Sequence, residues 1–326
     1  MTFTETEQKQ FHELGYVVKK DVYSKSDLQP LKDGLHEIVR RVAKHLQQEG
    51  KLINTFDHEP FETQLGAITK DNPQAGEEIM RVVKGQGGGG FKEQAMLDCL
   101  RHPPLLACIA QLVGNDIIGS SVYRVRPKVP SHVSGEVPWH QDSGYFMPHC
   151  DQHLIVTCWV PLVDATLDNG CLYVIPRAHK NGIICHYTGG HGNFLEIAAE
   201  DLPLEKPIPL EMTAGSVLFM TNLTPHASFE NNTNIVRWSI DLRYMGTNAP
   251  NNVDEDPATY TPERDPITMA CYPPEADFVV RDTQHPERDV VDVDTFQTIR
   301  KRYETVRAYK PGRGWTPFSE RQKPNR

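Results

Sequence analysis

Hydrophobic residues in the N-terminal third of the chain recur mostly at helical spacing. The clearest example runs from Leu31 to Leu46 and predicts an amphipathic helix that packs one face on a sheet and ends at Gly50. Ser26 and Gln29 precede this run at the spacing of a capping box. The same reasoning predicts a helix over residues 5–14, a strand over 16–22, and helices over 92–100 and 104–113.

From Ile117 onward the pattern changes to short strands with few helical stretches between them. Many consecutive strands favour a sandwich or barrel over a parallel sheet. The pair Asn169-Gly170 is typical of a hairpin turn. The predicted strands cover residues 121–128, 153–163, 172–175, 207–212, 216–220 and 237–245.

The composition shifts after about Gly246, where prolines become frequent. This shift predicts a domain over residues 1–245 and an extension over 246–326 that contains one helix, at 293–307. We expect the extension to wrap the domain, to contact a partner subunit in a homo-oligomer, or to be disordered from Lys310 onward.

The composition narrows the class of protein. The 326 residues are 38% hydrophobic and 24% charged, which is ordinary for a globular protein. A net charge of −9 argues against a nucleic-acid surface, and the apolar runs are too short to span a membrane. The seven cysteines include no Cys-x-x-Cys pair and the N-terminus shows no signal peptide, so we expect a reduced, cytoplasmic setting.

Three residues have the spacing of a metal site. His140 and Asp142 flank Gln141, and residues i and i+2 of a strand point to the same side, so both can reach one ion while Gln141 points away. His226 follows a predicted strand and supplies a third ligand from elsewhere in the sheet. Two histidines and one carboxylate form the facial triad of non-haem Fe(II) oxygenases, which leaves positions open for O₂ and a chelating co-substrate.

Arg237 indicates what that co-substrate is. It lies in a predicted strand whose apolar residues, such as Trp238, point to one face and whose polar residues point to the other. A buried strand carries a guanidinium inward only if an anion pairs with it. A dicarboxylate such as 2-oxoglutarate would be held there bidentately.

The segment His140–Phe146 resembles the metal motif of the phytanoyl-CoA dioxygenase family. The resemblance covers residues 5–245 and departs at Pro176–His179, where the family more often has Pro-Gly-Ser-His; that change concerns a turn and no ligand. It implies a mainly β fold with flanking helices and a double-stranded β-helix (jelly-roll, cupin-like) core, with Fe(II), 2-oxoglutarate and O₂. The other similar segments are residues 11–18, 158–179 and 226–237.

The resemblance also implies roles for further residues. The far carboxylate of 2-oxoglutarate would pair with Arg237 and accept a hydrogen bond from Ser228. Trp159 would form one wall of that pocket, and Lys84 would contact the same carboxylate. Asp142 fills the position that related halogenases leave to a small residue, which disfavours halogenation.

Two loops and two clusters of side chains have alternative interpretations. The glycine-rich stretch Lys84–Gly90 is either a flexible connection or a segment that closes over the co-substrate, and Cys185–Leu204 is expected to form a lid. Arg124, Arg126 and Lys128 either meet an anionic substrate or are ordinary strand charges. Four histidines are expected to be solvated or to face the substrate, and not to bind a second metal: His149, His153, His186 and His191.

Together these patterns predict an Fe(II)/2-oxoglutarate-dependent dioxygenase that hydroxylates an unactivated C–H bond of a small-molecule metabolite, with release of succinate and CO₂. The alternatives are a non-catalytic metal-binding sensor or scaffold, and a related oxygenase that desaturates, epimerises or demethylates. Arg237 and Ser228 favour an enzyme, since a scaffold needs no co-substrate clamp. The substrate stays open between acyl-CoA, amino acid, alkaloid, phosphonate and other metabolites.

Overall fold

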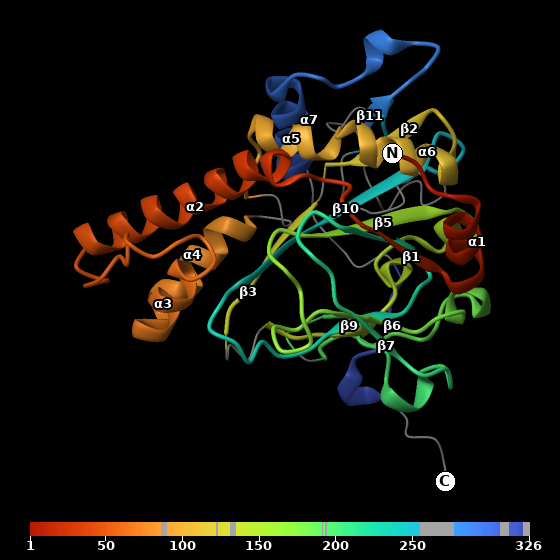
Figure 1. Cartoon of the computed structure of the whole chain (residues 1–326). Coiled ribbons are helices and arrows are strands. Elements are labelled where there is room, and N and C mark those ends of the chain that lie inside the picture. Colours follow the sequence, from red (N-terminus) through yellow and green to blue (C-terminus); the bar gives the residue numbers. More distant parts are fainter. Residues whose placement is uncertain are drawn as a thin grey trace.

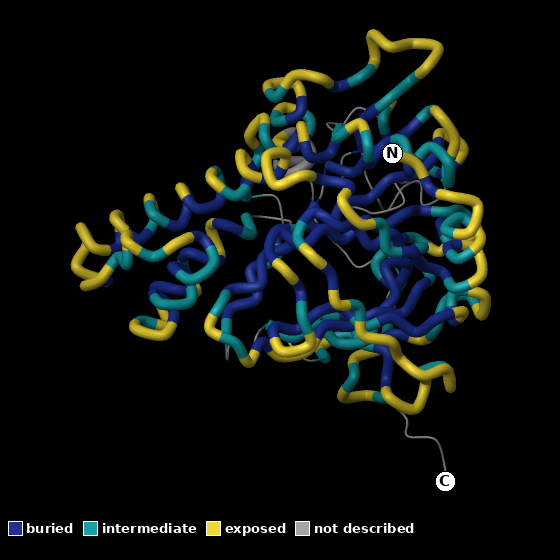
Figure 2. The backbone as a smooth tube through the Cα atoms, viewed as in Figure 1, coloured by how far each residue is buried: buried dark blue, intermediate teal, exposed yellow. Residues whose placement is uncertain are grey.

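Two antiparallel sheets face each other in the computed structural model of the chain, and helices cover the outer side of the larger sheet (Figure 1). The buried residues run along both sheets and along the inner faces of the helices (Figure 2). This is a double-stranded β-helix, or jelly-roll, core with flanking helices, so the predicted fold class is confirmed. The structure describes residues 1–85, 90–121, 123–130, 135–190, 192, 194–254, 277–306 (backbone only for 302–306) and 313–321.

The larger sheet is built around one long strand, β10 (Arg237–Gly246). This strand pairs with β5 (Ile155–Pro161) on one side, and with β3 (Arg124–Lys128) and β2 (Ile117–Ser120) on the other. The remaining strands extend the sheet beyond β5 and beyond β2: β8 (Val217–Thr221), β1 (Tyr16–Lys19) and β11 (Asp277–Arg281).

The smaller sheet has the strand order β4 (Val137–His140), β9 (His226–Ser228), β6 (Leu172–Val174) and β7 (Ile208–Leu210). His140 and His226 are direct partners in the pairing of β4 with β9. The sheet therefore brings together two residues that lie far apart in the sequence.

Side chains of β10 alternate between two environments, as the sequence predicts. Trp238 and Ile240 belong to the main hydrophobic core beneath the helices. Arg237, Asp241 and Arg243 instead line a pocket between the sheets. All 10 residues of the strand are buried, so β10 separates the apolar core from a polar interior.

The helices are α1 (Glu5–Leu14), α2 (Lys25–Gln48), α3 (Gln64–Asp71), α4 (Pro73–Lys84), α5 (Gln94–Leu100), α6 (Pro103–Val113) and α7 (Val293–Val306). In Figure 1, α2, α3 and α4 form an arm that projects to the left of the β core, and α5 and α6 lie above the larger sheet. Among the described residues, no helix is both long enough and apolar enough to cross a bilayer.

The start of α2 corrects one prediction. The capping box is formed by Ser24 and Asp27: the Ser24 hydroxyl accepts from the Asp27 amide at 3.2 Å and the Asp27 carboxylate accepts from the Ser24 amide at 2.7 Å. Ser24 is extended (φ −74°, ψ 167°), whereas Ser26 already lies inside the helix. An N-cap residue must have a non-helical backbone, so the predicted pair Ser26 and Gln29 cannot form the box.

Asn169-Gly170 forms a tight turn, but the predicted hairpin is wrong. The turn lies between β5 and β6, and these strands belong to different sheets. The Asn169 side chain accepts from the Thr166 amide at 2.8 Å and donates to the Asp164 carbonyl at 2.8 Å, and Gly170 has φ 78°. The same turn chemistry therefore carries the chain from one sheet to the other.

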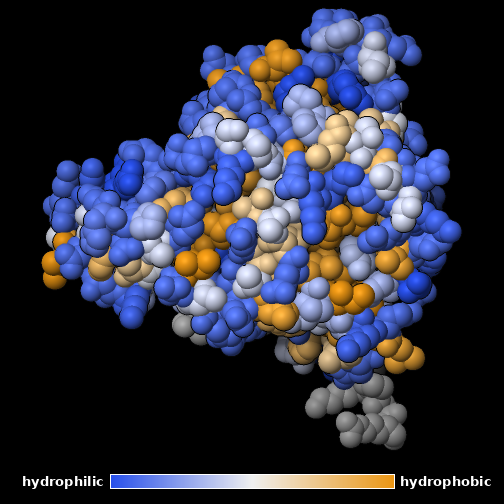
Figure 3. Space-filling model, in the orientation of Figure 1, coloured by the Kyte–Doolittle hydropathy of each residue, from blue (hydrophilic) through white to orange (hydrophobic). Residues whose placement is uncertain are grey.

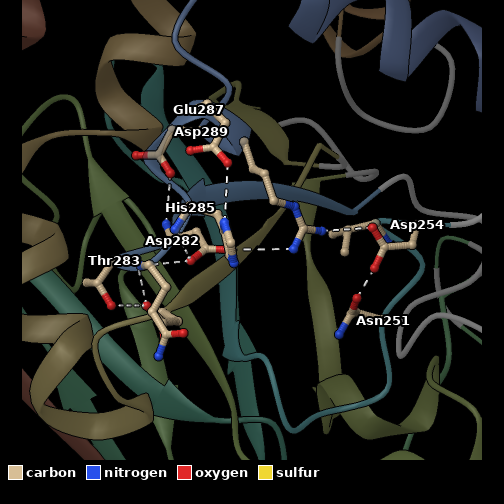
Figure 4. A network of polar contacts seen from close by, with 11 residues as sticks. Asn251, Asp254, Asp282, Thr283, His285, Glu287 and Asp289 are labelled. Atoms are coloured by element: carbon tan, nitrogen blue, oxygen red, sulfur yellow. Dashed lines mark hydrogen bonds and ion pairs between the residues drawn. The ribbon is translucent and has the colours of Figure 1, made fainter.

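Parts of the C-terminal extension pack on the domain. Its strand β11 pairs with β2, and the turn after β11 is closed by a polar network (Figure 4). In that network Asp282 accepts from the amides of Gln284 and His285 at 3.0 and 2.9 Å, and Arg288 pairs with Asp254 at 2.7 Å. Hydrophilic side chains cover most of the face seen in Figure 3, with hydrophobic ones in small groups between them.

Candidate metal and co-substrate site

The structure brings His140, Asp142 and His226 together at one end of the smaller sheet. Their potential ligand atoms all lie within 4.8 Å of one another, and all three residues are buried. The two imidazole rings are 4.2 Å apart between centroids. Within the part of the chain that the structure describes, this is the one group of three or more such side chains close enough to share a metal ion.

The geometry of the His-x-Asp segment differs from the prediction in one respect. Strand β4 ends at His140, and Asp142 begins a short 3₁₀ turn, η3 (Asp142–Gly144). Gln141 between them is still extended, with φ −111° and ψ 143°. Because one extended residue separates the two ligands, they point to the same side although they do not share a strand.

Hydrogen bonds to the backbone orient both histidines. Nδ1 of His140 lies 2.9 Å from the carbonyl of Pro138, and Nδ1 of His226 lies 3.0 Å from the carbonyl of Thr224. A carbonyl only accepts, so Nδ1 carries the proton on each ring and Nε2 is left as the metal ligand. Burial holds the pKa of His140 well below its usual range, which keeps the ring neutral and able to bind a metal.

Arg243 and Thr157 fix the third ligand. Arg243 donates from Nε to Oδ2 of Asp142 at 3.1 Å and from a terminal nitrogen to Oδ1 at 3.2 Å, and the Thr157 hydroxyl also donates to Oδ2. Burial alone would raise the pKa of Asp142, but the charge and hydrogen bond of Arg243, together with the two neighbouring histidines, lower the pKa below its ordinary value. Neither contact was predicted, because Thr157 and Arg243 lie on other strands, β5 and β10.

Gln141 points away from the other two, as predicted, and links neighbouring segments to the site. The side-chain nitrogen of Gln141 donates to the carbonyl of Leu223 at 2.7 Å, and its side-chain oxygen accepts from the backbone amide of Ile184 at 2.8 Å. Its own backbone amide donates to Nε2 of His186 at 2.9 Å. His186 is fully buried and therefore not solvated, whereas a role toward the substrate stays a prediction; His191 lies outside the described residues.

A buried guanidinium, that of Arg237, lies in the same pocket. Arg237 donates to the hydroxyl of Ser228 at 3.2 Å and to that of Ser239 at 2.7 Å, and its guanidinium lies 5.2 Å from the centre of the Trp159 ring. Nε of Arg237 and Nε1 of Trp159 are buried and have no hydrogen-bond partner among the described residues. Burial lowers the pKa of Arg237 to about 10. Two unpaired buried donors beside a cation fit an anionic ligand such as a carboxylate.

Lys84 is placed elsewhere. It is the last residue of α4, it does not line the pocket of His140 and Arg237, and its pKa is lowered by burial and by nearby Arg126. Residues 86–89, which follow it, lie outside the described residues, so its proposed contact with the co-substrate stays a prediction.

Lys128 is the lysine that lies beside Arg237. The two residues are direct partners in the pairing of β3 with β10. The Lys128 side-chain nitrogen donates to the carbonyl of Ser228 at 3.2 Å and also to that of Phe229. Burial, together with the charge of Arg237, lowers the pKa of Lys128 to about 6. The sequence signal was present, since Lys128 falls on the inward face of a predicted strand, but it did not separate this residue from its neighbours.

The chain is similar to known proteins of one family. The family model for phytanoyl-CoA dioxygenase (PhyH) matches residues 11–239. A phytanoyl-CoA dioxygenase of Arabidopsis thaliana is 32% identical over 114 residues, which are 35% of this chain and 40% of that protein. The peroxisomal phytanoyl-CoA dioxygenase of Homo sapiens is 23% identical over 252 residues, 73% of this chain and 67% of that protein.

Other similar proteins extend the comparison. A methylphosphonate hydroxylase of Gimesia maris is 23% identical over 243 residues, 74% of this chain and 81% of that protein. The chain spans only 40% and 41% of the two plant relatives. Among solved structures, the apo form of the non-heme monooxygenase ThoJ superposes with a TM-score of 0.54 at 17% identity, over 91% of this chain and 97% of that one, which shows a common fold. Because the family model spans most of the chain and includes His140, Asp142, His226 and Arg237, the chain belongs to the phytanoyl-CoA dioxygenase family.

Proposed function

We propose that the protein is an Fe(II)- and 2-oxoglutarate-dependent dioxygenase that hydroxylates an unactivated C–H bond of a small-molecule metabolite. The observation that carries this proposal is that one pocket contains both the two histidine ligands and Arg237. A ferrous ion fits a set of two neutral imidazoles and one carboxylate. A dicarboxylate fits the space between that set and a buried guanidinium.

Each residue has a distinct task in this proposal. When bound, Fe(II) and 2-oxoglutarate activate O₂ and supply the oxidant for the C–H bond, with succinate and CO₂ as by-products. Arg237 and Ser228 bind the far carboxylate, and the Trp159 ring excludes water from it. Arg243 and Thr157 hold Asp142 in place, so the ligand set is preorganised before the metal binds.

The non-catalytic alternative is less well supported. A scaffold would have no use for a buried, incompletely paired guanidinium beside a metal site, because such a group is costly without an anion. Asp142 also supports hydroxylation over halide transfer, since related halogenases have a small residue at this position of the metal motif.

The test is turnover of a metabolite extract by the Fe(II)-loaded protein with 2-oxoglutarate, under ¹⁸O₂ and at high chloride. We expect one metabolite to be consumed and its product to carry one labelled oxygen atom, with succinate formed in step. A chlorinated product, or a desaturated product without label, would rule out hydroxylation and leave the iron and 2-oxoglutarate assignment intact. Succinate no higher than in an iron-free control would favour the scaffold.

In this proposal the binding of 2-oxoglutarate is coupled to protonation of the Lys128 side chain. In the free protein its pKa is about 6, below the ordinary lysine value of about 10.4. Between these two pH values the unfolded chain binds more protons than the folded chain does. Lys128 therefore lowers the free energy of unfolding of the ligand-free protein in this pH range, and the loss becomes smaller as the pH rises. A bound carboxylate would favour the charged ammonium and raise the pKa of Lys128 again.

We therefore expect 2-oxoglutarate binding near pH 8 to take up as much as about one proton per site, because Lys128 changes from neutral to charged on binding. Calorimetric titration of the metal-loaded protein in two buffers with different heats of ionisation measures this uptake. In Lys128→Met, which keeps the stem but not the ammonium, the uptake should disappear. Equal proton uptake in both proteins would contradict the assignment.

We also propose that the protein acts in the cytoplasm and that residues 246–326 form an extension through which two copies associate. The support is that the six cysteines among the described residues are free thiols and that β11, from the extension, is at an edge of the larger sheet, where a second strand could pair. Light scattering of the full chain tests the association, and a monomer at every concentration would remove it.

A further inference from the structure

A segment near the C-terminus, residues 313–321, packs beside the metal-binding turn; we call it the C-terminal strap. It lies beyond the region that the family model matches. Arg313 donates from Nε to the carbonyl of Phe146 at 2.8 Å and forms an ion pair with Asp151. Both partners follow Asp142 closely in the sequence, so the strap contacts the segment that carries a metal ligand.

Trp315 contacts this segment most directly. Its indole Nε1 donates to the carbonyl of Gly144 at 2.7 Å, and Gly144 is the last residue of the turn that Asp142 begins. The indole ring also lies 5.4 Å from the ring of His186, whose Nε2 accepts from the amide of Gln141. Trp315 is thus one contact away from both sides of Asp142.

The strap also holds a loop that covers the metal-binding turn. The Thr188 amide donates to the carbonyl of Thr316 at 3.0 Å, and the Phe318 amide donates to the carbonyl of Thr188 at 2.7 Å. Arg321 forms an ion pair with Glu200 at the far end of the loop. We call residues 185–190 and 194–201 the covering loop.

The inner side of the covering loop touches the metal motif itself. The Ile197 amide donates to the carbonyl of Trp139 at 2.7 Å, and the Leu195 amide donates to the hydroxyl of Tyr145 at 3.1 Å. The covering loop is therefore held between the metal motif and the strap.

Arg243 and Thr157 hold the side chain of Asp142, and the contacts of the strap and the covering loop act on the backbone of its short turn. A 3₁₀ turn has poorer hydrogen-bond geometry than an α-helix. The turn is held by short-range backbone bonds: the Gly144 amide donates to Gln141 and the Tyr145 amide to Asp142, each at 2.9 Å, and the Phe146 amide donates to Ser143 at 3.1 Å. The Ser143 amide donates out of the turn, to Asn222 at 3.0 Å. A side chain that fixes the carbonyl of Gly144 from outside removes freedom that the turn would otherwise have.

We propose that Trp315 is a positioning residue for the metal site: it braces the turn of Asp142 and holds the covering loop closed over it. This inference rests on the proposed function for its purpose, since a fixed Asp142 and a covered metal matter to an oxygenase that must exclude water. The contacts themselves belong to this chain's C-terminal strap.

The test compares three full-length variants. Trp315→Ala removes the ring and the donor, Trp315→Phe keeps a ring against His186 but loses the donor, and Arg288→Ala is a control at an exposed ion pair of the same extension. Two properties are measured without substrate or 2-oxoglutarate: hydrogen exchange of the backbone amides, and the visible absorption of the Co(II)-loaded protein, which reports coordination geometry.

In Trp315→Ala we expect amides of residues 141–147 and of the covering loop to exchange at least about tenfold faster, and the Co(II) spectrum to change. Trp315→Phe should accelerate exchange in the turn by about two- to tenfold, as expected for one lost hydrogen bond. Arg288→Ala should match the native protein in both measurements.

Two results would overturn the proposal. One is exchange in Trp315→Ala that is unchanged in the turn or accelerated equally throughout β5 and β10, because the residue would then serve no local role or only global stability. The other is a Co(II) spectrum identical in all variants, because Asp142 would then be placed without Trp315. Neither measurement needs turnover, so a native protein that fails to oxidise any metabolite would disprove the proposed function and not the brace.

Discussion

Replacing His140 with alanine is expected to abolish metal binding and 2-oxoglutarate turnover together. His140 supplies one of three ligand atoms that lie within 4.8 Å of one another, and the remaining two cannot enclose a ferrous ion on one face. Loss of an outer-shell partner alone typically costs about 10- to 100-fold in metal affinity, so loss of a ligand should exceed that range. Metal content after dialysis and calorimetric titration with Fe(II) under anaerobic conditions measure the change.

His153→Ala provides the matched control, because this histidine lies in the same stretch of chain, is partly exposed and is outside the triad. It should keep both metal binding and turnover. The ligand-free His140→Ala protein should remain folded, since the hydrogen bond lost with the ring is a single one to the carbonyl of Pro138. Native metal affinity in His140→Ala would remove this residue from the ligand set.

Replacing Arg237 with alanine is expected to raise the apparent KM for 2-oxoglutarate without loss of the metal. The variant leaves a buried carboxylate without its charged partner, a loss of about 2–5 kcal/mol, or roughly 30- to 4000-fold in affinity. Arg237→Lys should recover only part of this loss, because an ammonium cannot replace the planar fork that reaches Ser228 and Ser239. Steady-state kinetics gives the KM for 2-oxoglutarate, and titration of the Mn(II)-loaded protein with 2-oxoglutarate gives its Kd.

Metal affinity in Arg237→Ala should stay near the native value, since Arg237 donates to Ser228 and Ser239 and to none of the ligands. Arg81→Ala, at an exposed arginine of α4, controls for the change of net charge. If Arg237→Ala binds 2-oxoglutarate as tightly as the native protein does, the guanidinium serves only the fold.

Local periodicity was sufficient to predict much of the fold. The alternation of β10 follows from its sequence because one face meets the apolar core and the other meets the pocket. Such an alternation can be recognised in the sequence because successive residues of a strand point in turn to the same two environments. The sequence also predicts that the third ligand comes from another strand close in space, and the pairing of β4 with β9 places His226 opposite His140.

Features that depend on contacts between distant residues were not predictable. Asp142 receives Arg243 from a strand 101 positions away, and Gly144 receives Trp315 from 171 positions away. The sequence does not separate Lys128 from Arg124 and Arg126, whereas the pairing of β3 with β10 places Lys128 beside Arg237. Such contacts produce no periodic pattern in the sequence, because nothing in the residues next to each partner identifies the other partner.

The position of both arginines on β10 limits how this chain can change in length. Arg237 and Arg243 face the same side only while the number of residues between them stays odd. A single inserted residue would turn one arginine toward the helices and bring an apolar neighbour such as Tyr244 toward the metal. Such an insertion would change none of the three metal ligands and would remove neither arginine from the chain. Only one arginine would still face the pocket, however, so either the support of Asp142 by Arg243 or the proposed binding of the co-substrate by Arg237 would be lost.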